Sequence, residues 1–274
     1  MGKKNNPIGI FDSGVGGLTV AHALHTLLPD ERIIYYGDTA HLPYGDKSRE
    51  TIIRYSLGIT DFLLQKNCKV ILIACNTASS NALDEVRDFV GDRARVLNVI
   101  DPVVENVCFE QGNVRNIGLI GTKATIGSGS YEKRIQELSK GMATQPQVNS
   151  LATPLLVPMI EEGFVFDDIS NAIIRAYLSR REMNGIDTLI LGCTHYPIIR
   201  NQISRFFNFD VNVLDTAQIV ALAVKKFLSD HELLSRESHG ENQFYVSDHT
   251  PYFEVIANMF FNEKIRLEKR HIWK

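Results

Sequence analysis

Two cysteines occupy matching places in the sequence, and their surroundings point to acid/base chemistry. Cys75 follows the apolar run 70–74, and Cys193 follows the similar run 188–192. Each then precedes a segment with helical patterning. Catalytic groups gather at the carboxyl ends of strands in open α/β sheets, and a helix N-terminus favours the thiolate form of a cysteine. We therefore interpret both cysteines as functional.

Two thiols at one site have a use besides forming a disulfide. They can stand on opposite sides of a carbon acid, where one removes a proton and the other supplies one, which inverts the stereocentre. The residues that adjoin the two cysteines suit this task, because they offer amide, hydroxyl and imidazole groups. These neighbours are Asn76, Thr77, Thr194 and His195. The remaining cysteines, Cys68 and Cys108, are interpreted as ordinary core thiols.

A tight polar turn follows the first apolar run of the chain. It reads Asp12-Ser13-Gly14-Val15-Gly16-Gly17. It is not a dinucleotide fingerprint, because Thr19 takes the place of the third glycine, and it is not a phosphate-binding loop, because no Gly-Lys-Ser/Thr follows. The turn is therefore interpreted as presenting Asp12 and Ser13 to a small polar ligand.

The other polar segments give weaker signals. Residues 37–45 follow the second apolar run and predict a rigid polar loop at the same edge of the sheet. The adjacent carboxylates Glu161 and Glu162 indicate by themselves only a solvated face. The Cys193-x-His195 pair lacks the second cysteine of a structural zinc site, so we predict no metal. No lysine motif marks a pyridoxal phosphate site, and no cofactor is predicted.

The elements that must position these residues alternate between strands and helices. Eight short runs are rich in β-forming residues, and several are continuously apolar, as parallel strands covered on both faces are. They are residues 8–11, 33–36, 70–74, 96–100, 117–120, 188–191, 211–214 and 244–246. Amphipathic helices are predicted between them, for example over 48–66 and 167–182. This alternation predicts an α/β fold with mostly parallel sheets.

The chain also repeats this pattern. The strand before Asp12 and the strand before Thr122 both end in polar turns, and the strands before Cys75 and Cys193 follow them at similar separations of 63 and 71 residues (75 − 12 and 193 − 122). Two such pairs suggest two related lobes. Cys75 and Thr122 lie on either side of a lobe boundary that we place near residue 100.

The composition bounds the class of protein. The chain has 274 residues, a net charge of −3, 44% hydrophobic residues and four cysteines. These values argue against extended disorder, a dedicated nucleic-acid binder and a disulfide scaffold. No apolar run is long enough to span a membrane, and residues 1–6 are too polar for a secretory signal. We expect a soluble cytoplasmic protein.

These residues, taken together, resemble the glutamate racemases of the cofactor-independent aspartate/glutamate racemase superfamily. The ordered motifs that carry the resemblance span nearly the whole chain. They are Asp12-Ser13-Gly14-Val15-Gly16-Gly17-Leu18, Tyr36-Gly37-Asp38, Pro43-Tyr44-Gly45, Ala74-Cys75-Asn76-Thr77-Ala78-Ser79, Gly121-Thr122-Lys123-Ala124-Thr125-Ile126, Gly192-Cys193-Thr194-His195-Tyr196-Pro197 and Leu214-Asp215-Thr216-Ala217.

The resemblance implies a fold of two pseudo-symmetric flavodoxin-like lobes that face each other across a central cleft. Lobe A would comprise residues 1–99 and 210–274 and carry Asp12 and Cys75. Lobe B would comprise residues 100–209 and carry Thr122 and Cys193. The implied reaction interconverts L-glutamate and D-glutamate without a cofactor and supplies D-glutamate for bacterial peptidoglycan.

The resemblance also implies residue roles. Cys75 would abstract the α-proton of the D-enantiomer and Cys193 that of the L-enantiomer, assisted by Asp12, His195 and Glu161. Substrate would be held by a set of polar and loop residues that includes two of these helpers. The set is Asp12, Ser13, Tyr44, Gly45, Asn76, Thr77, Thr122, Thr125, Thr194 and His195. The expected partners are the substrate and a second copy of the chain in a homodimer, with neither membrane nor nucleic acid.

Three alternatives remain open from the sequence. The chain could be an aspartate racemase, although the first loop of that enzyme lacks the Asp-Ser-Gly-x-Gly-Gly pattern seen here. It could be a related enzyme that uses one thiol as a nucleophile, such as an amidase or decarboxylase, although both Cys75 and Cys193 are present. It could also be a binding or moonlighting protein. Some family members carry an N-terminal extension linked to activation by a cell-wall precursor, and Asp12 lies close to Met1, so we expect no such regulation.

Overall fold

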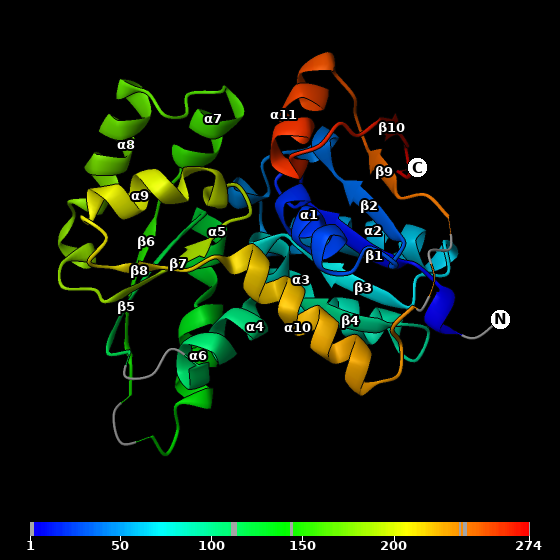
Figure 1. Ribbon diagram of the computed structural model, residues 1–274, viewed down its shortest axis with the longest axis horizontal. Coiled ribbons are helices and arrows are strands. Elements are labelled where there is room, and N and C mark those ends of the chain that lie inside the picture. The colour runs from blue at the N-terminus through cyan, green and yellow to red at the C-terminus, as the bar shows by residue number, and fades with distance from the viewer. Residues whose placement is uncertain (1–2, 111–113, 143–144, 236, 238–239, 274) are drawn as a thin grey trace.

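Two parallel sheets make up the frame of the computed structural model, which describes residues 3–110, 114–142, 145–235, 237 and 240–273. Met1 and Gly2 of the polar N-terminal segment lie outside this range. The six-stranded sheet has the order β10-β9-β2-β1-β3-β4, and the four-stranded sheet has the order β6-β5-β7-β8. Figure 1 shows the two sheets in opposite halves of the molecule. The predicted α/β fold with two lobes is confirmed.

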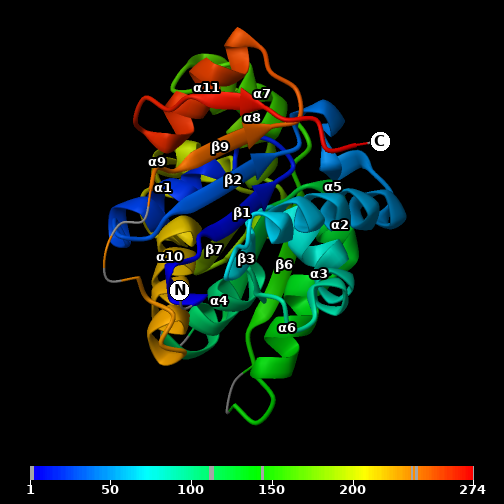
Figure 2. The ribbon, with the colours of Figure 1, turned by 90° about the vertical axis from the view of Figure 1, so that its right-hand side faces the viewer.

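The strands of the larger sheet are short and mostly apolar. They are β1 (Ile8–Asp12), β2 (Ile33–Gly37), β3 (Val70–Ile73), β4 (Arg95–Asn98), β9 (Gln243–Val246) and β10 (Leu267–Lys269). Successive side chains point to opposite faces, so Ile10 and Leu72 pack in one apolar cluster while Phe11 and Ile73 pack in another. Both faces are therefore buried, as the continuously apolar runs predict. Figure 2 shows β9, β2, β1 and β3 side by side.

The smaller sheet repeats this arrangement. Its strands are β5 (Asn116–Gly121), β6 (Gln147–Ala152), β7 (Thr188–Gly192) and β8 (Asn212–Val213). Strand β8 lies beyond residue 209, where the sequence places the return to lobe A, and it pairs with β7. Strand β8 thus belongs to the four-stranded sheet. The assignment of residues to the two lobes stays a prediction.

Helices connect the strands and cover the sheets. They are α1 (Leu18–Leu27), α2 (Arg49–Gln65), α3 (Asn76–Val90), α4 (Ile100–Glu105), α5 (Lys123–Ser128), α6 (Ser130–Leu138), α7 (Leu156–Glu161), α8 (Asp168–Leu178), α9 (Arg200–Phe206), α10 (Thr216–Asp230) and α11 (Pro251–Phe261). The pair α2 and α3 packs together, while α1 packs with α10 and α11. Within the described residues, no helix is long and apolar enough to cross a membrane.

All eight predicted strands are present, and two further strands were missed. Strands β6 and β10 each lie at an edge of a sheet, and most of their side chains are partly or fully exposed, so they lack an apolar run. The strand predicted over 96–100 ends earlier, at Asn98. The reason is local, because Asn98 Oδ1 accepts hydrogen bonds from the backbone N–H groups of Ile100 and Asp101 and so begins α4.

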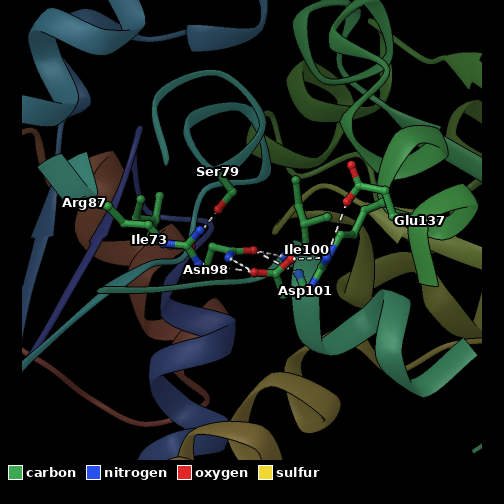
Figure 3. A network of polar contacts seen from close by, with 8 residues as sticks. Ile73, Ser79, Arg87, Asn98, Ile100, Asp101 and Glu137 are labelled. Carbon is green, nitrogen blue, oxygen red and sulfur yellow. Dashed lines mark hydrogen bonds and ion pairs between the residues drawn. The ribbon is translucent and has the colours of Figure 1, made fainter. Parts of the chain in front are cut away.

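The same junction holds the two halves together (Figure 3). Asp101 accepts hydrogen bonds from Asn98 at the end of β4, from Arg87 on α3 and from Arg134 on α6. The distances are 2.7, 3.4 and 3.0 Å. Helices α3 and α6 belong to different lobes, so this carboxylate ties the helix that begins beside Cys75 to the second lobe.

Candidate active site

A cavity of about 220 Å³ lies where the carboxyl ends of the two sheets meet. Most of the residues that the sequence singles out line this one cavity. They are Ser13, Tyr44, Gly45, Cys75, Asn76, Thr77, Thr122, Glu161, Cys193, Thr194 and His195. The other two, Asp12 and Thr125, stand behind the wall and hydrogen-bond to residues that line it. The structure thus brings together side chains from both lobes.

Cys75 is the N-cap residue of helix α3 and is 4% exposed. Its sulfur accepts a hydrogen bond from Ala78 N at 3.4 Å, and its thiol lies 3.5 Å from Ser13 Oγ. Burial, and after it the negative charge of Asp12, nevertheless raise the pKa of the Cys75 thiol to about 12, although these hydrogen bonds lower it. The helix N-terminus therefore does not make this thiol a resting thiolate, contrary to the simple reading of its position.

Asp12 is fully buried at the end of β1. Its carboxylate accepts hydrogen bonds from Gly14 N at 2.9 Å and from Thr194 Oγ1 at 3.3 Å. Burial raises the pKa of Asp12, while the nearby His195 and these donors lower it. The Asp12–Thr194 bond joins the two lobes, because Asp12 ends β1 of one sheet and Thr194 follows β7 of the other, 182 positions along the chain.

Cys193 follows β7 and stands beside His195. The Cys193 sulfur lies 3.8 Å from His195 Nδ1, and His195 Nε2 lies 2.9 Å from Glu161 Oε1 on α7. Burial lowers the pKa of His195, but the hydrogen bonds to Cys193 and Glu161, together with the charges of these partners, outweigh burial and raise it to about 10. A protonated His195 stabilises negative charge on the sulfur of Cys193.

A glycine allows the first loop to reach this histidine. A Cβ atom on Gly16 would lie 2.4 Å from His195 Nδ1 and 2.6 Å from Thr194 Oγ1. Real Cβ atoms do not approach other atoms this closely, so only glycine fits at position 16 without a shift. The glycine-rich turn therefore serves close contact between the lobes rather than phosphate binding.

Hydroxyl and amide groups make up another wall of the cavity. Thr77 Oγ1 lies 2.9 Å from Thr122 Oγ1 and 3.2 Å from Thr125 Oγ1. Gly45 packs against Thr122, where a Cβ atom would come within 2.7 Å of the threonine Cβ. Asn76 accepts a hydrogen bond from Tyr131 at 2.6 Å. These groups can donate to carboxylates, and the N-terminus of α3 points its free N–H groups the same way.

The contacts that hold the Tyr44 loop in place were not predicted from the sequence. Tyr44 donates a hydrogen bond to the buried Asp38 at 2.7 Å, and His41 Nδ1 lies 2.8 Å from the same carboxylate. Asp38 belongs to the Tyr36-Gly37-Asp38 motif, but nothing in the sequence indicates that its partners lie three and six residues on. The cavity is also lined by apolar residues of lobe B, including Val157 and Pro158, that no motif marks.

All four cysteines are free, and none pairs with another. Among the described residues, no group of three or more histidine, cysteine, aspartate or glutamate side chains has the arrangement of a metal site. The arrangement of the thiols and carboxylates around the cavity suits proton transfer. They stand as a buried thiol beside a carboxylate and a second thiol beside an imidazole.

The chain matches known proteins along its length. The family model for Asp/Glu/hydantoin racemase matches residues 18–224. A relative from Chlorobaculum parvum, named glutamate racemase, is 41% identical over 95% of this chain and 94% of its own. One from Aquifex pyrophilus, also named glutamate racemase, is 43% identical over 92% of each chain. The crystal structure of glutamate racemase from Francisella tularensis in complex with D-glutamate is 38% identical, with a TM-score of 0.90 over 98% of both chains.

Proposed function

The chain belongs to the Asp/Glu/hydantoin racemase family, and on that premise we propose that it interconverts L-glutamate and D-glutamate with two thiols. It is a racemase, an isomerase that inverts one stereocentre. The observation that carries the two-thiol mechanism is the placement of Cys75 and Cys193 in one cavity, each after a strand of a different sheet.

In the proposed reaction, Cys193 as thiolate takes the α-proton of L-glutamate, and the Cys75 thiol gives its own proton to the opposite face. The product is D-glutamate, Cys193 is left as a thiol and Cys75 as a thiolate. The reverse reaction uses Cys75 as the base. Each step moves one proton, so no oxidant, reductant or co-substrate enters.

The surroundings of the two thiols support this division. The raised pKa of Cys75 keeps its proton at neutral pH, as an acid requires, and burial beside Asp12 is the cause. His195, with its pKa raised to about 10, is positively charged at neutral pH and lies against Cys193. Paired groups whose environments push their protonation apart are the usual sign of an acid and a base.

Substrate recognition in this proposal rests on the polar wall. A glutamate has two carboxylates and an ammonium group, and the cavity offers hydroxyl donors from Thr77, Thr122 and Ser13 together with the N-terminus of α3. The carboxylate of Glu161 can accept from an ammonium. Fixed donors in a buried cleft also stabilise negative charge at the α-carbon, which has no cofactor to receive it in this mechanism.

Deuterium exchange tests the proposal and separates its two halves. In D₂O with no added cofactor, the wild-type protein is expected to exchange the α-proton of both enantiomers and to invert them. Cys75→Ala is expected to lose inversion by about 100- to 10,000-fold while Cys193 still exchanges L-glutamate. Cys193→Ala is expected to show the mirror pattern with D-glutamate. Near-native inversion in either folded variant, followed by polarimetry and circular dichroism, contradicts the two-thiol mechanism.

The wider role follows from the product. We propose that the protein supplies D-glutamate for peptidoglycan and works in the cytoplasm, where its four free cysteines suit a reducing compartment. We also propose a homodimer, supported by the exposed aromatic side chains Phe166 and Phe209, which a subunit interface would cover. Light scattering coupled to gel filtration measures the mass, and a monomer at micromolar concentration contradicts that proposal.

A further inference from the structure

The C-terminal tail lies beside the loop that supplies one wall of the cavity. Strand β10 pairs with β9, and after it Arg270 N donates to Val246 O at 2.8 Å while Tyr36 donates to Arg270 O at 2.9 Å. These bonds lead the tail across the edge of the sheet towards α2 (Figure 2). The tail carries Trp273, the only tryptophan of the chain.

Trp273 closes a cluster of aromatic rings. Its ring meets His41 edge-on at 5.1 Å and Tyr55 at 5.3 Å, and His41 in turn stacks on Tyr55 at 4.1 Å. Gly58 on α2 leaves the room, because a Cβ atom there would lie 2.4 Å from the Trp273 ring. Among the described residues, the buried indole N–H meets no hydrogen-bond acceptor. Packing rather than hydrogen bonding therefore holds Trp273 in place.

This cluster joins directly onto the cavity. His41 hydrogen-bonds to Asp38, and Asp38 accepts the hydroxyl of Tyr44, whose ring also packs at 5.7 Å from Tyr55. Residues 42–46 supply five successive members of the cavity wall. Tyr44 is thus held from two sides, by the Asp38 carboxylate and by the ring of Tyr55.

We propose that Trp273, His41 and Tyr55 are positioning residues for Tyr44, so that the end of the chain takes part in substrate binding. The inference rests on the proposed function only in taking glutamate as the ligand of the cavity. Tyr44 is the residue that touches substrate in this scheme, and Trp273 acts through it. The rings fix the loop before glutamate arrives, which removes an ordering cost from binding.

Steady-state kinetics of Trp273→Ala test the proposal. Two edge contacts of aromatic rings are lost, so the KM for glutamate is expected to rise about five- to tenfold. Little change is expected in kcat, because the loss concerns binding. Trp273→Phe is expected to restore most of the wild-type KM, since no hydrogen bond is involved. If the alanine variant does not fold, Trp273→Leu replaces it in this comparison, because leucine keeps apolar volume beside Gly58 but removes the aromatic ring.

A matched control separates positioning from general loss of packing. Phe227 stacks on His231 with the same centroid distance of 4.1 Å and interplanar angle of 25° as the His41–Tyr55 stack, but on α10 and away from the cavity. Phe227→Ala is expected to lower stability with the KM unchanged. Equal KM values in Phe227→Ala and Trp273→Ala overturn the proposal.

A double-mutant cycle tests the route through Tyr44. In a Tyr44→Phe background, Trp273→Ala is expected to change KM by less than about twofold, because the hydroxyl it positions is gone. Effects that simply multiply overturn the proposal. If the wild-type protein does not racemise glutamate, the proposed function fails separately. D-glutamate affinity of the wild-type and Trp273→Ala proteins, measured by calorimetry, then still decides this inference.

Discussion

Removing the charge of Glu161 is expected to lower the pKa of His195 while leaving the fold intact. The pKa of His195 stands at about 10 because hydrogen bonds to Cys193 and Glu161, together with the charges of these partners, outweigh burial. The side chain of His195 is 4% exposed and that of Glu161 is 24% exposed, so solvent screens their 2.9 Å contact only in part. A buried hydrogen bond to a charged group is worth about 1.5–3 kcal/mol, which corresponds to a pKa decrease of about one to two in Glu161→Gln.

Nuclear magnetic resonance of the histidine ring nitrogens measures this directly. The chain has eight histidines, and the resonances of His195 are assigned by their loss in His195→Gln. Glu162→Gln is the matched control, because it removes the same charge from the next residue, which is exposed and is not among the causes of the raised His195 pKa. A His195 pKa that stays near 10 in Glu161→Gln, or that moves equally in Glu162→Gln, refutes the reasoning.

The same pair makes the stability of the protein depend on pH. The folded-state pKa of His195 lies above its usual value of about 6.5, so the stability it contributes is fully present below pH 6.5. This contribution is lost as pH rises through about 10. Over that range the wild-type protein is expected to lose up to about 5 kcal/mol of unfolding free energy from this group. In Glu161→Gln the loss should be smaller and should end at lower pH.

Three further changes are expected to have measurable effects. Gly16→Ala pushes a methyl group against His195, so kcat/KM should fall at least about tenfold with a lower melting temperature; wild-type values contradict the close packing of the lobes. The raised pKa of Cys75 predicts that stability falls as pH rises from 9 to about 12, by about 4 kcal/mol from this thiol. Urea titrations between these pH values should show a smaller fall in the stability of Cys75→Ala than of the wild-type protein, and an equal fall argues against a raised Cys75 pKa. Asp101→Asn weakens the contacts with its two arginine partners and should cost about 1 kcal/mol in urea unfolding, whereas an unchanged midpoint argues that the junction is held by packing alone.

The sequence predicts the strands of the sheets well where they are buried on both sides. Runs such as 8–11 and 70–74 contain no polar side chain, because each face of the sheet is covered. Strands β6 and β10 escape the same reasoning, because an edge strand buries fewer of its side chains and reads as ordinary polar chain. The edge strands β4 and β8 were predicted because they overlap the mostly apolar runs 96–100 and 211–214, whereas β6 and β10 have no such run.

The parts of the site that local motifs mark could be predicted from the sequence. Cys75 and Cys193 follow equivalent strands, so their convergence at one cavity follows from the topology of parallel sheets. The contacts that tune them do not, because Asp12 meets Thr194 across 182 positions of the chain. Trp273 likewise lies more than 200 positions from His41. Such contacts depend on how closed lobes and a terminal tail pack, which no local pattern encodes.

The scaffold repeats itself, but the charges around the two thiols do not. Cys75 faces the carboxylate of Asp12, which opposes a thiolate, whereas Cys193 faces the imidazole of His195, which favours one when protonated. Under the proposed mechanism, a turnover from L-glutamate to D-glutamate leaves the negative charge on the disfavoured sulfur. Burial and the charge of Asp12 raise the pKa of Cys75, so both favour the return of a proton to this thiol after turnover. In this proposal the geometry supplies a thiol on each side of the substrate, and the carboxylate of Asp12 favours Cys75 as the acid when L-glutamate is the substrate.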